Sequence, residues 1–398
     1  MADETPPAEP APTPEPLAPR HRRSVVRIIV TTQLLLALLT ATVVVMVYNN
    51  LSGNLQALPG VPSSVDRPDE MEFDGPKKPL NILVMGSDSR DGEGNDIDGQ
   101  TGLGARSDTT LLLHVSADRE DAYGVSLPRD AIVDRPDCAM ADGESVEGEE
   151  GVLFNTAFAV GGPLCTIQMV EKLTDIRINH YVTIDFNGFK DMVDAVNGVE
   201  VCIPKEVNDP GHDIFLDAGR QTLTGPEALN YVRERTVLSV TGDIGRMKRQ
   251  QAFIASMVNK VVSAGTLSRP DRVYRFLDAA TESLYVDEGL DSLAALADLA
   301  RQFQDTGLTK IKFITVPIEE YELDANRLVW TDAAKDLWRR MRNDLPLGKN
   351  FTKDSLNAEE PVGTPSGGPS GSSSEPDGEP SPGEQEADAE RLANGLCA

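Results

Sequence analysis

The stretch LNILVMGSDSRDG (80–92) decides the fold, because an apolar run ends abruptly in a polar turn that contains glycine. The six residues from Leu80 to Met85 predict a buried strand, and the turn after them carries Asp88 and Arg90. Two further runs predict strands of the same kind, TTLLLHV (109–115) and AYGVSL (122–127). These three strands are expected to lie side by side in one sheet.

Strand patterns alternate with helical ones along the rest of the chain. Further strands are expected at 182–184 and 310–316. Helical periodicity is found at 164–174, 187–196, 225–232, 243–262, 269–282, 290–303 and 332–342. This alternation predicts an α/β fold with a layered sheet, and such folds place their chemistry at the strand ends and in the loops that follow.

The composition limits the class of partner. The 398 residues carry a formal net charge of −27, with 40% hydrophobic and 25% charged residues. A nucleic-acid-binding protein needs a basic face, so we expect no nucleic-acid partner. A local basic cleft remains compatible with this charge.

The first apolar run predicts a membrane anchor. Residues 28–48 contain no charged side chain and span about 30 Å as a helix, which is enough to cross a bilayer. Four arginines precede the run, whereas residues 49–76 hold one cation and five acids. This asymmetry predicts a cytoplasmic N-terminus and an extracytoplasmic remainder in the cell membrane. A cleaved signal peptide is the alternative, although the run is longer than a usual signal core.

Composition shifts divide the chain into five segments. We expect a disordered cytoplasmic N-terminus, a transmembrane helix, an extracytoplasmic linker, a folded catalytic domain and a disordered acidic Pro/Gly/Ser-rich tail. Their limits are 1–27, 28–48, 49–76, 77–350 and 351–398.

Four cysteines follow the membrane segment, where oxidation is permitted: Cys138, Cys165, Cys202 and Cys397. Four cysteines allow three pairings. We favour Cys138 with Cys165 and Cys202 with Cys397, and one bridge with two free thiols is the alternative.

Polar pairs follow or precede the three first strands. They are Asp88 with Arg90, Arg106 with Asp108, and Arg129 with Asp130. Adjacent antiparallel strands would bring Asp88 and Asp108 together, and two carboxylates that meet repel unless a cation lies between them. Mg²⁺ suits such a pair, with Mn²⁺ as an alternative. The Gly/Asp-rich loop at 91–104 is expected to form a mobile flap.

The stretch YVRERTVLSVTGDIGRMKRQQ (231–251) gathers five cations in this acidic chain. We expect Arg233 and Arg235 to project on one side of an extended segment. The apolar stripe of the next helix, traced back toward its start, reaches Arg246, Arg249 and Gln250, and leaves Lys248 on the surface. A helix start with inward arginines favours phosphate. The alternative is an internal ion-pair network with Asp130, Glu234 or Asp243.

Taken together, these segments resemble the LytR-CpsA-Psr family of bacterial envelope proteins, in its actinobacterial form. The resemblance is carried by GSDSR (86–90), ARSDTTLLLHV (105–115), SLPRD (126–130), FNTAFAVGGP (154–163), HYVTIDFNGFKDMVDAVNGVEV (180–201), AGRQTLTGPEALNYVRERT (218–236) and GDIGRMKRQQAFI (242–254). The resemblance to the family weakens after about residue 265.

The resemblance implies a three-layer α/β/α sandwich around a mixed sheet, with a deep hydrophobic pocket for a polyprenyl chain. It also implies a magnesium-dependent phosphotransferase. Such an enzyme moves a glycopolymer from a polyprenyl-pyrophosphate carrier onto peptidoglycan, at the 6-hydroxyl of N-acetylmuramic acid. The positions that match the family's pyrophosphate-binding residues are Arg90, Arg106, Arg129, Arg233, Arg235 and Gln250, with Arg249 close by.

The metal and catalytic roles follow from the same resemblance. Asp88 and Asp108 match the metal positions, and Asp243 matches a carboxylate suspected of helping catalysis. Arg129 and Asp130 are further catalytic candidates. The alternatives are a non-catalytic envelope protein that binds or senses such lipids, and a pyrophosphatase that acts on them. The sequence does not indicate which glycopolymer is transferred.

Overall fold

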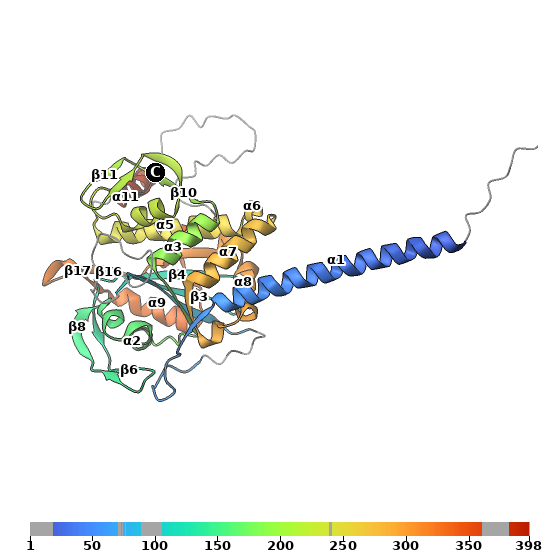
Figure 1. The fold of residues 1–398 in the computed structure, drawn as a ribbon. Helices are drawn as coiled ribbons and strands as arrows, with labels where there is room; N and C mark the ends of the chain where they lie inside the picture. The colour runs from blue at the N-terminus through green and yellow to red at the C-terminus, as the bar shows by residue number, and fades with distance from the viewer. Residues whose placement is uncertain are drawn as a thin grey trace, which may run out of the picture. The chain divides into compact units, whose positions relative to one another are not determined.

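The computed structural model describes residues 19–70, 73, 75, 77–88, 106–238, 241–359 and 382–397 (Figure 1). The chain divides into two compact units, residues 1–50 and 51–398, which are described separately. Most of the predicted N-terminal segment, the flap at 91–104 and the middle of the tail lie outside the described residues. Arg90 lies outside them as well.

The first helix, α1, runs from Pro19 to Asn54 and contains the predicted membrane segment. Within it, residues 24–54 are long and apolar enough to cross a membrane, by length and composition. The helix therefore extends beyond the expected limits of 28–48 at both ends.

The centre of the second unit is one mixed sheet of eight strands, in the order β1-β14-β9-β2-β3-β4-β15-β18. The strands are β1 (Gln56–Leu58), β2 (Leu80–Ser87), β3 (Ser107–Val115), β4 (Ala122–Leu127), β9 (His180–Ile184), β14 (Leu284–Asp287), β15 (Ile311–Thr315) and β18 (Leu356–Asn357). Strands β2, β3 and β4 pair antiparallel with one another, whereas β9 runs parallel to β2 and β15 parallel to β4. All five predicted strands therefore belong to this sheet.

Successive side chains of a strand point to opposite faces of the sheet, so a strand that is apolar throughout has apolar side chains on both faces. Helices cover both faces of this sheet and bury these side chains. The helices of this unit that have seven or more residues are α2 (Thr156–Thr174), α3 (Phe186–Ala195), α4 (Gly225–Arg233), α5 (Asp243–Val262), α7 (Pro270–Ser283), α8 (Leu293–Thr306), α9 (Asp332–Arg342) and α11 (Pro382–Ala393). Helices α2 and α9 lie on one side of the sheet and α5 on the other (Figure 1). Leu83, Met85 and Leu112 share a buried cluster with residues of α2 and α9, whereas Leu111 and Phe313 share one with residues of α5. The expected three-layer α/β/α sandwich is confirmed.

Outside the main sheet, the described residues form five separate two-stranded sheets. The paired strands are β5 (Ile132–Arg135) with β8 (Glu149–Leu153), β6 (Cys138–Ala139) with β7 (Ser145–Val146), β10 (Val199–Ile203) with β13 (Gly219–Leu223), β11 (Val207–Asp209) with β12 (Ile214–Leu216), and β16 (Ile318–Tyr321) with β17 (Asp324–Trp330). Short helical turns complete the chain: α6 (Ala264–Leu267), α10 (Lys349–Thr352), η1 (Glu288–Leu290) and η2 (Leu308–Lys310).

The folded unit extends beyond the predicted limits of 77–350. Strand β1 lies in the predicted linker and pairs with β14, while β18 lies in the predicted tail and pairs with β15. The end of the tail is also folded, because α11 forms and Leu396 is buried. The expectation of one continuous disordered tail is therefore wrong for residues 351–359 and 382–397. Flanking Pro/Gly/Ser-rich sequence concealed these short segments.

Both favoured disulfides are present. Cys138 pairs with Cys165, which links the β6–β7 hairpin to α2, and Cys202 on β10 pairs with Cys397. The second bridge ties the end of the described chain to the middle of the domain.

Candidate functional site

The antiparallel pairing of β2, β3 and β4 brings the polar strand ends together at one edge of the sheet. Gly86 pairs with Thr109 and Ser87 with Ser107, so that Asp108 is the extra residue of a β-bulge. Strand β4 ends at Leu127, opposite Thr110, and is followed by Pro128 and Arg129. The bulge and the end of β4 therefore place Asp108 beside Arg129.

Asp108 is the centre of a cluster of arginines. Its Oδ1 accepts a hydrogen bond from Arg129 Nη1 at 2.7 Å. Its Oδ2 accepts bonds from Arg246 Nη2 at 3.0 Å and from Arg235 Nη2 at 3.4 Å. Burial alone would raise the pKa of Asp108, but the guanidiniums of Arg246, Arg129 and Arg235 lower it well below its usual range. Asp108 is thus ionised throughout the physiological pH range.

Arg129 is surrounded by three carboxylates. Besides Asp108, it lies 3.2 Å from Asp243 Oδ1 and 3.3 Å from Asp130 Oδ2. Burial lowers the pKa of Arg129, but Asp243, Asp108 and Asp130 outweigh this effect and raise it. Arg129 therefore contacts both of the other predicted catalytic residues, Asp130 and Asp243.

The start of α5 supplies a second arginine from inside the protein. Asp243 is the first residue of α5, and Arg246 lies one turn later with only 2% of its surface exposed. Arg246 contacts Asp243 at 3.4 Å as well as Asp108, and its Nε donates to the Val232 carbonyl at 3.3 Å. The predicted inward, cationic face of this helix start is confirmed.

Arg235 is the exposed member of the cluster, with 45% of its side chain accessible. Burial, together with the like charges of Arg246 and Arg129, lowers the pKa of Arg235 to about 10, so that it remains protonated at neutral pH. Arg233 is the last residue of α4 and not part of an extended segment, which corrects the expected shared orientation of the two arginines. Its guanidinium carbon lies 5.1 Å from the centre of the Phe186 ring.

The structure does not bring Arg249 to Asp108. Arg249 and Glu234 are both fully buried, and Arg249 Nη2 lies 3.4 Å from Glu234 Oε2. The same guanidinium donates to the backbone carbonyls of Glu234 and Asn394. Gln250 is buried beside it and donates to the Val232 carbonyl at 3.2 Å. The internal ion-pair alternative therefore applies to Arg249, which pairs with Glu234, and also to Arg246, which pairs with Asp243. Arg249 and Gln250 both donate hydrogen bonds to backbone carbonyls.

Lys248 does not join the arginine cluster, but it is not the ordinary surface residue that the sequence predicts. It is half-buried, and its Nζ donates to the Asp354 carbonyl at 3.2 Å. It therefore contacts the segment next to β18 and not the arginine cluster.

Asp88 and Arg106 lie next to the bulge, at the same edge of the sheet, and are hydrogen-bonded to each other. The Asp88 backbone N–H donates to the Arg106 carbonyl at 2.9 Å, and the Arg106 N–H donates to Asp88 Oδ1. Asp88, which follows β2, thus lies next to the bulge that contains Asp108, and these are the two predicted metal positions. Among the described residues, no three His, Cys, Asp or Glu side chains form a ready metal cage. Mg²⁺ would need additional oxygens from phosphate and water here.

Arg327 is a member of the site that the sequence did not reveal. Its Nη1 lies 3.1 Å from Asp130 Oδ1, and the next residue, Leu328, donates its N–H to the Asp130 carbonyl at 3.4 Å. The β16–β17 hairpin therefore reaches the end of β4 across about 200 residues of chain. Its polar sequence gave no signal of this contact.

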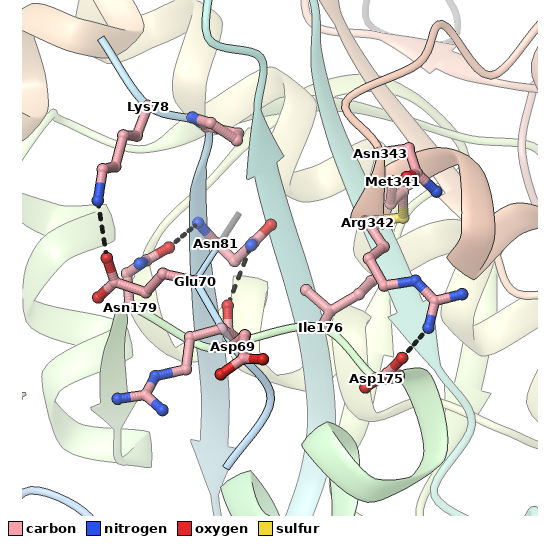
Figure 2. Close-up of a pocket in the computed structure, with 12 residues that line it drawn as sticks. Asp69, Glu70, Lys78, Asn81, Asp175, Ile176, Asn179, Met341, Arg342 and Asn343 are labelled. Carbon is pink, nitrogen blue, oxygen red and sulfur yellow. Dashed lines mark hydrogen bonds and ion pairs between the residues drawn. The ribbon is translucent and has the colours of Figure 1, made fainter. Parts of the chain in front are cut away.

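A cavity of about 210 Å³ lies away from these residues, at the beginning of β2 (Figure 2). Asn81 and Asn179 line it, together with ion pairs that are satisfied among themselves, such as Lys78 with Glu70 at 3.0 Å. It contains none of the predicted site residues, so we place the functional site at the Asp108 cluster.

Comparison with known proteins identifies the family of this chain. The sequence model of the LytR_cpsA_psr family matches residues 51–343. The cell wall biosynthesis protein LcpA of Corynebacterium glutamicum is 34% identical over 262 residues, which are 60% of this chain and 50% of that protein. The polyisoprenyl-teichoic acid–peptidoglycan teichoic acid transferase TagU of Enterococcus faecalis is 34% identical over 221 residues, 56% of this chain and 65% of that protein. The chain thus matches less than two thirds of the length of these relatives.

The fold has solved counterparts too. The LytR-Csp2A-Psr enzyme from Actinomyces oris superposes with a TM-score of 0.52 at 20% identity, covering 72% of this chain and 97% of that one. At this identity, the similarity supports the fold alone. On the family match over most of its length, the chain belongs to the LytR-CpsA-Psr family, as a member of actinobacterial type.

Proposed function

We propose that this protein is a phosphotransferase of cell wall assembly. It would move a glycopolymer from a polyprenyl-pyrophosphate carrier onto peptidoglycan, outside the membrane to which α1 anchors it. The observation that carries this proposal is the convergence of Arg129, Arg235 and Arg246 at the start of α5. Guanidinium forks and free helix N–H groups together are suited to a pyrophosphate. The relative TagU is named as a transferase of the same kind.

The lipid end of the donor would lie on the α5 face of the sheet. Val84 and Leu113 belong to the central strands β2 and β3, yet both remain only half-buried there. Phe303 of α8 and Val258 of α5 are also half-buried apolar side chains, packed against the same cluster. A sheet covered by helices usually buries such positions completely. These side chains therefore suit an apolar polyprenyl chain.

The reaction follows from the chemistry of the proposed donor. An acceptor hydroxyl oxygen, at position 6 of N-acetylmuramic acid, attacks the phosphorus next to the glycan. A phosphorus–oxygen bond to the acceptor forms, the bond to the bridging oxygen breaks, and polyprenyl phosphate leaves. The three arginines hold the phosphate oxygens and stabilise their charge, which is the main requirement of phosphoryl transfer.

The carboxylates have two proposed roles. Asp88 and Asp108 would hold Mg²⁺, which supplies further positive charge to the pyrophosphate when bound. Asp243 or Asp130 would take the proton of the acceptor hydroxyl. Both lie within 3.3 Å of Arg129, so their charge and the position of Arg129 are coupled.

The test uses the full chain in detergent, since folded segments occur on both sides of the predicted domain limits. A polyprenyl-pyrophosphate glycan and peptidoglycan are supplied with and without Mg²⁺, and glycan attachment is measured. We expect metal-dependent attachment that is lost in folded Asp88→Ala and Arg129→Ala variants. Tight lipid binding without turnover under any divalent metal would instead indicate a sensor. Release of free glycan phosphate without attachment would indicate a pyrophosphatase.

A further inference from the structure

The loop between α4 and α5 connects two residues of the proposed site. Arg235 stands at its beginning and Asp243 at its end, where α5 starts. Arg235 lies 3.4 Å from Asp108, and Asp243 lies 3.2 Å from Arg129. The described parts of this loop, residues 234–238 and 241–242, therefore adjoin two groups of the site.

The buried carboxylate of Glu234 organises the first half of the loop. It accepts hydrogen bonds from the backbone N–H groups of Thr236, Val237 and Leu238. Arg249 balances its charge from α5 at 3.4 Å. The loop thus folds around a fully buried ion pair, and such a pair requires well-placed partners.

The end of the chain completes this arrangement. Residues 394–397, which we term the C-terminal clasp, follow α11 and are fixed to β10 through the Cys202–Cys397 disulfide. The Asn394 carbonyl accepts a hydrogen bond from Arg249 Nη1 at 3.4 Å, and Asn394 Oδ1 accepts one from the Thr241 hydroxyl at 2.8 Å. The clasp therefore contacts both the ion pair and the second half of the loop.

Gly395 shows how closely the clasp is fitted. Its φ is +73°, and a Cβ at this position would lie 2.5 Å from the Leu238 carbonyl oxygen and 2.9 Å from Arg249 Nη1. Leu238 belongs to the loop and Arg249 to the ion pair. The Leu238 carbonyl is part of the backbone, so it can move only if the loop moves with it. Any side chain at this position must push the clasp away from the loop.

We propose that the C-terminal clasp is a positioning part of the pyrophosphate site, because it fixes the Glu234–Arg249 pair and thereby the spacing of Arg235 and Asp243. The clasp itself touches no reacting atom. This inference rests on the proposed function, since it assumes that the arginine cluster binds pyrophosphate.

The main test compares two glycine substitutions in the full chain in detergent. Gly395→Ala introduces the contacts described above, whereas Gly348→Ala meets nothing within 4 Å at a similar φ of +75°. Both substitutions place alanine at a positive φ, and at Gly348, where ψ is 171°, the backbone region is essentially restricted to glycine. The strain at Gly348 is therefore at least as large, so that an effect confined to Gly395→Ala reports the clasp. We expect faster hydrogen exchange at the amides of residues 236–238 in Gly395→Ala only. We also expect its affinity for inorganic pyrophosphate to fall about tenfold or more.

A milder pair of variants serves if Gly395→Ala does not fold. Thr241→Val removes the hydroxyl that donates to Asn394, and Thr241→Ser retains it. We expect pyrophosphate affinity to fall about threefold in the valine variant and to be restored in the serine variant. A role in stability alone would not produce this rescue at a temperature where all variants are folded.

Three results would overturn the inference. Unchanged exchange at residues 236–238 in Gly395→Ala would show that the clasp does not hold the loop. Wild-type pyrophosphate affinity in both Gly395→Ala and Thr241→Val would show that pyrophosphate binding does not depend on the clasp. A wild-type chain that binds no pyrophosphate would refute the proposed donor site, and this inference with it. The first two leave the proposed function intact.

Discussion

Arg129 Nη1 lies 2.7 Å from Asp108 Oδ1, and this contact joins the end of β4 to the bulge of β3. The same carboxylate contacts Arg246 and Arg235 through its other oxygen. It is the one group among the described contacts that touches all three arginines. The cluster therefore depends on the ionised form of Asp108.

Asp108→Asn should destabilise the folded protein at neutral pH by about 1–3 kcal/mol, because three guanidiniums lose a charged acceptor. The folded-state pKa of Asp108 lies below its unfolded value of 3.8. Its contribution is therefore complete above that value and is lost as the pH falls through the folded-state pKa. Urea unfolding of both proteins at pH 7, 5 and 3.5 measures the difference. A gap that widens toward acid pH would contradict this account.

Arg235→Ala should abolish glycan transfer, whereas Lys248→Ala should have little effect. Arg235 contacts Asp108, and 45% of its side chain faces solvent, where a substrate can reach it. Lys248 lies on the same helix as Arg246 but bonds to the Asp354 carbonyl instead. Initial transfer rates of the two variants, compared at equal amounts of folded protein, test this difference. Equal losses in both would show that the charge of the segment matters and not its geometry.

Arg249→Ala should mainly reduce stability. It leaves the fully buried Glu234 carboxylate without its cation, and breaking a buried pair costs about 3–5 kcal/mol. Arg235→Ala, which removes a half-exposed cation, is the matched comparison and should change the unfolding free energy by less than about 1 kcal/mol. Chemical denaturation of both variants decides between a structural and a ligand-binding Arg249. A stable Arg249→Ala variant that no longer binds pyrophosphate would restore the role expected from sequence.

Local sequence patterns predicted the elements well, because periodicity and polarity changes act over a few residues. The strand at 80–85 and the helix at 243–262 follow from their own side chains. The inward position of Arg246 also followed from periodicity, since α5 keeps one stripe along its length. The disulfide partner of Cys202 was expected, but the fold that brings Cys397 there was not.

Long-range contacts were the part that the sequence concealed. Arg249 shares its helix face with Arg246, yet its partner Glu234 is decided by how the α4–α5 loop closes. Arg327 comes from a hairpin with no distinctive pattern and still reaches Asp130. Charge and periodicity place a side chain on a face, whereas the choice among several nearby carboxylates depends on tertiary packing.

Glycan transfer should require a divalent cation that Asp88 helps to hold. Chelation with EDTA should stop transfer, and Mg²⁺ should restore it. At a Mg²⁺ concentration that sustains the wild-type rate, Asp88→Ala should lose transfer. Restoring it should need at least about tenfold more Mg²⁺, because one of two carboxylate ligands is lost. Asp118→Ala is a suitable control, since Asp118 lies in the turn at the other end of β3 and bonds to the Ser116 hydroxyl. Unimpaired transfer in EDTA would refute the metal site.

The two disulfides should contribute unequally to stability. Cys138 and Cys165 are separated by 27 residues, whereas Cys202 and Cys397 are separated by 195. In the chain-entropy model, a bridge restricts the unfolded chain more when it closes a longer loop, which gives about 3.5 and about 5 kcal/mol for the two. Replacing each pair by serines, followed by denaturant unfolding, compares them directly. The Cys202→Ser/Cys397→Ser protein should be the less stable of the two, and the reverse order would show that local packing outweighs loop length here.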